Sequence, residues 1–143
     1  MIGTFHKIKH ISVLAIFFFC SMVFLLFLSW WVYPYKTIEM EQPYHILTKT
    51  VEQGGLLKYE INYCKYTDVN PRVNRQFIDG IIYATPEATA VIKKGCGTII
   101  NTIGIPHNLP NGNYKLKSIV SYEMNPIRII THEYITEEFS VIK

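Results

Sequence analysis

Residues 11–33 read ISVLAIFFFCSMVFLLFLSWWVY, and no Lys, Arg, Asp, Glu, Pro or Gly interrupts them. At about 1.5 Å rise per residue, a helix of this length is roughly 34 Å long. That length is enough to span a hydrocarbon core of about 30 Å with some tilt. Residues 11–33 are therefore predicted to form a transmembrane helix, which leaves the rest of the chain tethered on one side of a membrane.

The flanks of this helix predict its orientation and its fate. Lys7 and Lys9 lie in residues 1–10, and because cytoplasmic flanks favour basic residues, this tail is predicted to be cytoplasmic. The apolar run is longer than the roughly 7 to 15 residues of a signal peptide and lacks a small-residue cleavage site, so an uncleaved signal anchor is predicted. A cleaved, secreted module beginning near Pro34 is the alternative. An aromatic belt at the far membrane interface is predicted for Trp30, Trp31, Tyr33 and Tyr35.

The remaining residues are predicted to form a stalk over 34–43 and one small β domain over 44–143. From Leu57 to Tyr63 apolar and polar residues alternate, which is typical of a half-buried strand. Similar runs separated by Gly, Pro, Asn and Asp predict about seven strands and an antiparallel sandwich. The predicted strands cover 44–51, 57–63, 73–83 with a bulge or hairpin at Asp79-Gly80, 90–93, 99–105, 114–122 and 127–141 with a bulge at 136–138.

Residues 109–116, LPNGNYKL, resemble the Leu-x-x-Gly-x-Tyr signature of immunoglobulin-like sandwiches. The resemblance implies that Tyr114 forms a tyrosine corner, bonding its hydroxyl to nearby backbone, and that Gly112 permits the turn. Leu116 stands where the antibody-type pattern has a cysteine, and Phe77 is the candidate substitute for the absent tryptophan. A generic strand-turn-strand is the alternative. Tyr134, on the last strand, is predicted to be more exposed than Tyr114.

A narrower resemblance covers residues 105–141, which look like immunoglobulin-like modules of membrane-anchored phage and bacterial proteins. Cys64 and Cys96 are the cysteines outside the predicted membrane helix, and in an oxidising compartment such a pair is expected to form a disulfide. Alternation places Cys64 opposite the Tyr59-Ile61-Tyr63 face, so the bridge is expected at the outer surface or an edge. Two free thiols in a cytosolic domain are the alternative.

No motif in the sequence announces a reaction. The net charge of +3 is mild and the basic residues are spread along the chain, so nucleic-acid binding is not expected. Phosphate-loop, dinucleotide, Gly-x-Ser-x-Gly and His-Glu-x-x-His motifs are missing, and no catalytic residue, cofactor or metal is predicted. Two weaker candidate sites remain. A metal or acid–base site could be formed by histidines and carboxylates, namely His45, His107, His132, Asp68, Asp79 and Glu133. A basic patch could be formed by Lys65, Arg72, Arg75, Lys93 and Lys94, although a solvated strand face is the stronger interpretation of these residues.

The sequence thus predicts a non-enzymatic single-pass membrane protein with an immunoglobulin-like domain in the periplasm or at the cell surface. Its predicted role is binding or assembly, as an accessory or structural subunit that contacts another protein through a sheet edge or end loops. A phage-encoded surface protein fits this interpretation equally well. The alternative is an extracytoplasmic enzyme or metal-handling domain.

Overall fold

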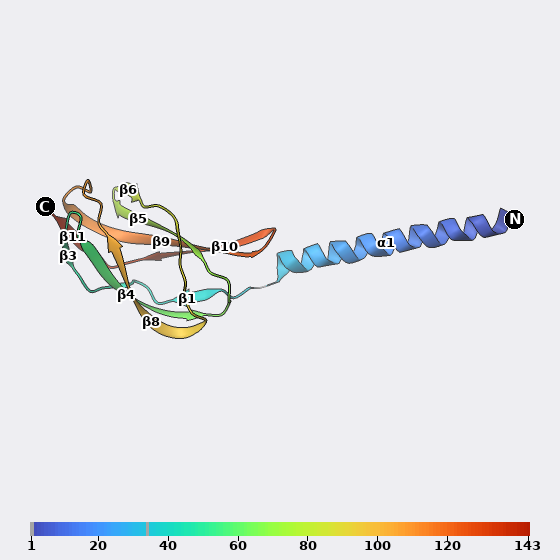
Figure 1. Cartoon of the computed structure of the whole chain (residues 1–143), viewed down its shortest axis with the longest axis horizontal. Helices are drawn as coiled ribbons and strands as arrows, with labels where there is room; N and C mark the ends of the chain where they lie inside the picture. The colour runs from blue at the N-terminus through green and yellow to red at the C-terminus, as the bar shows by residue number, and fades with distance from the viewer. Residues whose placement is uncertain (1, 34) are drawn as a thin grey trace. The chain divides into compact units, whose positions relative to one another are not determined.

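The computed structural model describes the backbone of residues 2–33 and 35–143, and the side chains of 13–33 and 35–143. It divides into two compact units. The first contains Met1–Tyr35 and Asn125–Arg128, and the second contains Lys36–Met124 and Ile129–Lys143. Figure 1 traces the chain from the N-terminal helix into the β-rich unit.

The helix α1 spans Ile2–Val32, so it begins well before the predicted membrane segment and includes most of the predicted tail. Its stretch Val13–Val32 has a mean hydropathy of 2.5, and none of that stretch is buried in the structure. Leu, Ile, Phe and Val side chains are exposed around the whole helix rather than along one stripe. A helix that is apolar all round is suited to a lipid environment or to a large protein core.

Two sheets form the β-rich unit, and they lie over one another as layers (Figure 1). The first sheet is built around the ten-residue strand β4, Leu56–Lys65, which pairs antiparallel with every other member. Its other strands are β1 (Ile38–Met40), β2 (His45–Ile46) and β8 (Gly95–Gly104).

The second sheet is built around the fourteen-residue strand β9, Gly112–Asn125. Pairing within it is antiparallel, except that β3 and β11 run parallel. Its other strands are β3 (Thr50–Glu52), β5 (Arg72–Asp79), β6 (Ile81–Ala84), β7 (Ala88–Thr89), β10 (Arg128–Ile135) and β11 (Phe139–Ile142).

The core lies between the sheets and is rich in aromatic rings. Alternate residues of β4 and β9 point inward because successive side chains of a strand face opposite sides. The Tyr44 ring stacks between those of Tyr59 and Tyr134, at centroid distances of 5.9 and 5.7 Å. Phe77 meets Phe139 edge-on at 6.2 Å, so it occupies the core as expected of a tryptophan substitute.

The predicted fold class is confirmed: the chain is mainly β, with one N-terminal apolar helix and an immunoglobulin-like sandwich of two sheets. The described part of the chain has eleven strands rather than about seven, because several of them have only two to four residues. The predicted strand 44–51 is divided between β2 in one sheet and β3 in the other. The predicted strand 127–141 is likewise divided, at the predicted bulge, into β10 and β11; both pair with β9, and β11 also pairs with β3.

Three local predictions differ from the structure. The sheet extends into the predicted stalk, because β1 pairs with the end of β4. Residues 90–93 are not a strand; Ala90 and Ile92 instead pack against the core beside the short strand β7. Tyr134 is buried rather than exposed: its side chain is 5% exposed against 2% for Tyr114, and it packs against Tyr44.

Candidate functional site

The disulfide between Cys64 and Cys96 is present, and it lies within one sheet. The two residues are directly opposite each other on β4 and β8, 32 positions apart in sequence, with Cα atoms 4.0 Å apart. Cys64 occupies the outer face of β4, as its alternation with Tyr63 predicted. The bridge therefore fastens β8 to the sheet and does not cross the core.

Hydrogen bonds around β4 show which side of β8 is free. The carbonyls of Lys58 and Asn62 accept bonds from the chain on the β1 and β2 side, so even-numbered residues of β4 point away from β8. The backbone groups of the odd-numbered residues of β4 therefore point toward β8. In agreement, the carbonyl of Gly55, also odd-numbered, accepts a bond from the amide of Ile105. Because backbone groups alternate in direction along a strand, the amides and carbonyls of the even-numbered residues of β8 point away from β4.

That other side of β8 has no strand beside it among the described residues. The amides and carbonyls of Thr98, Ile100 and Thr102 make no backbone hydrogen bond outside the β4 ladder in this part of the chain. Unpaired groups along a strand edge are a template for another extended segment. This row of free backbone groups, from Thr98 to Thr102, is called the β8 edge below.

The side chains of β8 do not oppose pairing with another strand. Its sequence GCGTIINTIG contains no charged residue and no proline, and five of its ten residues are β-branched. Thr98, Ile100 and Thr102 lie on the outer face, where Ile100 is 61% exposed. Natural proteins commonly protect a sheet edge with charges, proline or short strands, and β8 has none of these.

A shallow depression of about 500 Å³ lies on the outer face of the first sheet beside the disulfide. It is lined by residues 39–41, 62–64 and 96–98, so it joins β1, β4 and the start of β8.

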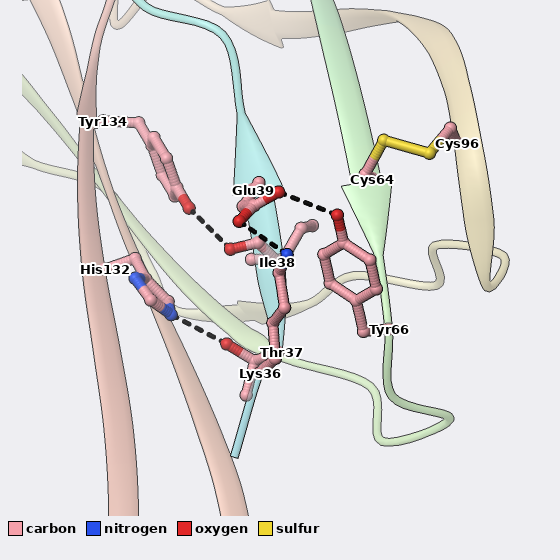
Figure 2. Close-up of polar contacts among 9 residues, drawn as sticks. All are labelled: Lys36, Thr37, Ile38, Glu39, Cys64, Tyr66, Cys96, His132 and Tyr134. Carbon is pink, nitrogen blue, oxygen red and sulfur yellow. Dashed lines mark hydrogen bonds and ion pairs between the residues drawn. A yellow bond between two sulfur atoms is a disulfide. The ribbon is translucent and has the colours of Figure 1, made fainter. Parts of the chain in front are cut away.

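On the far side of β4, exposed charged groups hold β1 (Figure 2). Lys36 Nζ lies 2.9 Å from a Glu39 oxygen and 4.1 Å from the centre of the Tyr66 ring. Tyr66 donates its hydroxyl proton to the other Glu39 oxygen at 2.7 Å. The hydrogen bond from Lys36 lowers the pKa of Glu39, and the same bond raises the pKa of Lys36.

Beneath β1, two side chains of β10 bind its buried face (Figure 2). His132 Nε2 lies 2.7 Å from the buried Thr37 hydroxyl, and burial lowers the pKa of His132. Tyr134 donates to the carbonyl of Ile38 at 3.5 Å, and burial raises the pKa of Tyr134 to about 12. These contacts tie β1 to the opposite sheet.

The structure does not gather the predicted basic residues into one patch. Arg72 pairs with Glu123 at 2.9 Å and Lys94 with Asp68 at 3.0 Å. Lys65 does not belong to a solvated strand face: it is 2% exposed and donates to the Ile92 carbonyl at 2.6 Å, and burial lowers its pKa.

Arg75 also departs from a solvated strand face, because it shares the inward side of β5 with Val73 and Phe77. It lines a small cavity of about 30 Å³ between the sheets, together with Ser118 and Asn101. Within the described side chains, Arg75 Nε and Ser118 Oγ have no hydrogen-bond partner. Most of the cavity lining is apolar, but the cavity volume is sufficient for one water molecule, and these two polar groups could bond it.

The histidines have separate surroundings. His45 lies 3.3 Å from Glu137, whereas His132 contacts Thr37. Among the described residues, no group of three or more His, Cys, Asp or Glu is arranged to hold a metal ion.

At the predicted corner, the Tyr114 hydroxyl donates to the Pro110 carbonyl at 2.9 Å, and the ring is buried. Gly112 has no positive φ, so it is not needed for a left-handed turn. Its role is close approach, because a Cβ there would lie 2.9 Å from Asp79 Oδ2. Leu116, in the place of the antibody-type cysteine, is fully buried.

The predicted interface aromatics lie at the C-terminal end of α1 and just after it. Trp31 and Tyr33 are exposed, and the rings of Tyr33 and Tyr35 are 4.8 Å apart. Phe27 and Trp30 meet edge-on at 5.9 Å. Their placement at a membrane surface stays a prediction.

The chain was compared with protein families, curated proteins and solved structures. No protein-family model matches the chain, and no curated protein does. Among solved structures, the chain is similar to the CARDB domain of a Pyrococcus furiosus protein in complex with di-metal ions, with 17% identity, coverage of 74% of this chain and 86% of that chain, and a TM-score of 0.38. It is also similar to a Listeria innocua β-glucosidase in complex with glucose, with 12% identity and a TM-score of 0.40; that match covers 76% of this chain and 16% of the enzyme.

Sequence reasoning placed Cys64 and Cys96 together but did not identify the β8 edge. A local signal was available: residues 95–104 form a ten-residue run without charge or proline. The odd phase of Lys65, two residues after Tyr63 on the inward face, likewise indicated that this lysine is buried.

Proposed function

We propose that this protein is a single-pass, membrane-anchored binding or assembly module that acts through protein–protein contacts. One observation carries the proposal: β8 presents a ten-residue, uncharged strand whose outer edge is unpaired in the described part of the chain. Addition of an extended segment to such an edge is a common mode of recognition, in which backbone bonds supply affinity and side-chain contacts supply specificity. The role is non-enzymatic, and a phage-encoded or bacterial accessory subunit fits it.

The apolar helix supports the anchoring part of the proposal. Val13–Val32 is long enough to cross a membrane, and its large apolar side chains are exposed on every side. Burying one such side chain in an apolar medium stabilises a protein by about 1.5 to 3 kcal/mol. We therefore place this stretch in the bilayer, with Trp30, Trp31, Tyr33 and Tyr35 at the far interface.

The disulfide supports an extracytoplasmic position for the β domain. Disulfides persist in oxidising compartments and are rare in the cytosol. Together with Lys7 and Lys9 before the helix, the Cys64–Cys96 bridge favours a cytoplasmic N-terminus and a periplasmic or cell-surface domain. Protease added to intact cells or spheroplasts should then degrade the β domain, and protection until the membrane is broken would reverse the orientation.

Site-specific photocrosslinking in membranes tests the docking role. A photoreactive amino acid at Thr98, on the β8 edge, is expected to give a discrete adduct of defined mass. The matched control is Thr131, an exposed threonine on the outer face of β10. Adducts of equal yield at both positions, or none at Thr98, would contradict the proposal.

A further inference from the structure

We propose that the segment paired with the β8 edge is β8 of a second copy of this chain, running antiparallel and centred on Ile100. This inference rests on the proposed function, because it uses the same docking edge and names its occupant. The result is a two-fold dimer in which the four-stranded sheets of two copies join into one continuous sheet.

The outer face of β8 is self-complementary about Ile100. Antiparallel pairing centred there places Ile100 opposite its own copy and Thr98 opposite Thr102. The row Thr-x-Ile-x-Thr therefore reads the same from both ends, as a two-fold interface requires. The aligned side chains are β-branched, and such cross-strand pairs stabilise a sheet.

The free backbone groups have the phase that this register needs. Even-numbered residues of β8 direct their amides and carbonyls outward, away from β4. Ile100 and its copy would thus form a hydrogen-bonded pair, exchanging two bonds, with Cα atoms about 5.5 Å apart. Thr98 and Thr102 would satisfy their free groups in the same way.

Charge does not oppose the pairing of β8 with a second copy. The paired strands carry no charge, so no like charges face each other across the new ladder. The lysines nearest to β8 along the chain, Lys93 and Lys94, would lie beside His107 and Pro106 of the other copy. At about 3.4 Å per residue, the two Lys94 residues are roughly 40 Å apart along the pair, well beyond the Debye length.

The assembly closes as a dimer because the other edge of the first sheet is unsuited to the same pairing. There β1 and β2 have three and two residues, Pro43 separates them, and Glu39 and Glu41 are exposed. Pairing through β8 alone buries less area than a standard interface, so the dimer is weak between free molecules. Two copies confined to one membrane meet at a higher effective concentration, which offsets this weakness.

Disulfide trapping of the full chain in membranes tests the register. In a Cys20→Ser background, Ile100→Cys is compared with Ile81→Cys, whose parent isoleucines are 61% and 63% exposed and lie on edge strands of the two different sheets. Mild oxidation should give at least tenfold more covalent dimer for Ile100→Cys, and peptide mass spectrometry should show position 100 linked to position 100. A pair 5.5 Å apart at Cα is within disulfide reach.

A second measurement does not depend on the new thiol. Chains carrying donor or acceptor dyes at the C-terminus should show energy transfer in vesicles, and Ile100→Lys should abolish it by placing two lysines opposite each other. Ile81→Lys should leave the transfer unchanged, with an unaltered circular dichroism spectrum for both variants.

Equal dimer yields at positions 100 and 81, a ladder of species above the dimer, or energy transfer that survives Ile100→Lys would each overturn the second-copy assignment. If Thr98 photocrosslinks to a different protein instead, the second-copy assignment fails while the proposed docking function stands; if Thr98 gives no adduct, both fail.

Discussion

On one side of β4, the edge of the first sheet consists of β1 and β2, which together contribute five residues interrupted by Pro43; on the other side, β8 contributes ten without interruption. The β1 side is further held by Lys36, Glu39 and Tyr66 on its surface and by His132 and Tyr134 beneath it. The β8 side is held by its ladder to β4 and by one disulfide.

The first sheet is therefore protected against edge-to-edge association at one of its two edges and not at the other. Short strands, proline and charge are the common means of preventing edge-to-edge association, and all three occur at the β1 side. None of the three occurs at β8, although β8 pairs with the same strand, β4, as β1 does. The two edges can therefore be perturbed separately, and the perturbations should differ in size.

The largest expected effect comes from removing the bridge that fastens β8. Replacing both Cys64 and Cys96 by Ser should lower the free energy of unfolding by about 3 to 4 kcal/mol, because the bridge closes a loop of 32 positions in the unfolded chain. Denaturant unfolding of the full chain in detergent, followed by near-ultraviolet circular dichroism, measures this loss. Cys20→Ser is the control, and a loss below about 1 kcal/mol for the double variant would contradict the importance of the bridge.

The next effect compares two buried tyrosine hydroxyls, one at the corner and one beneath β1. Tyr114→Phe removes a 2.9 Å bond to Pro110 and should cost about 0.5 to 1.5 kcal/mol, the usual net value of a hydrogen bond. Tyr134→Phe removes a 3.5 Å bond to Ile38 and should cost less. Thermal or denaturant midpoints of the two variants decide the order, and a larger loss at Tyr134 would mean that the contact to β1 is the stronger one.

A smaller effect should appear as pH dependence at the β1 side. Burial lowers the pKa of His132, so below its ordinary value of about 6.5 the unfolded chain binds a proton that the folded chain does not. This contribution to stability is therefore complete above pH 6.5 and declines as the pH falls toward the lowered pKa. His132→Gln should flatten the stability profile between pH 7.5 and 5, as followed by thermal unfolding; an unchanged slope would contradict it.

The smallest effect is expected at the surface of β1. Glu39 pairs with Lys36 and Tyr66, but the pairs are exposed to solvent, and ion pairs of this kind contribute little to stability. Glu39→Gln should leave the unfolding midpoint unchanged within error at physiological salt. A clear loss that disappears in high salt would show that this exposed network matters more than its exposure indicates.

Much of the fold follows from local pattern. An uninterrupted apolar run predicts α1, and strict alternation predicts β4 and β9 with the correct inward faces. The Asp79-Gly80 turn also has a local cause, because Gly80 adopts a positive φ. The break before β11 instead involves a distant contact, because the Leu116 amide donates to the Thr136 hydroxyl.

The remainder depends on pairing between distant residues. The three-residue strand β1 is too short to show a period, and it is recognisable only by its partner β4. Whether a strand has one neighbour or two is a property of the sheet, so the uncovered edge of β8 could not be predicted from alternation. Lys65 was misjudged because its charge outweighed its inward phase in the interpretation of the sequence.

The parallel pair of β3 and β11 has a consequence for synthesis. Among the described residues, β3 pairs with one strand, β11, in which Ser140 lies opposite Thr50 and about 90 residues after it. Such distant pairs form late in folding. The second sheet therefore cannot be completed before β11 has been synthesised, whereas β4 and β8 can pair and oxidise earlier. Folding of the β domain should consequently proceed in two stages, with the first sheet cross-linked before the last strand closes the second.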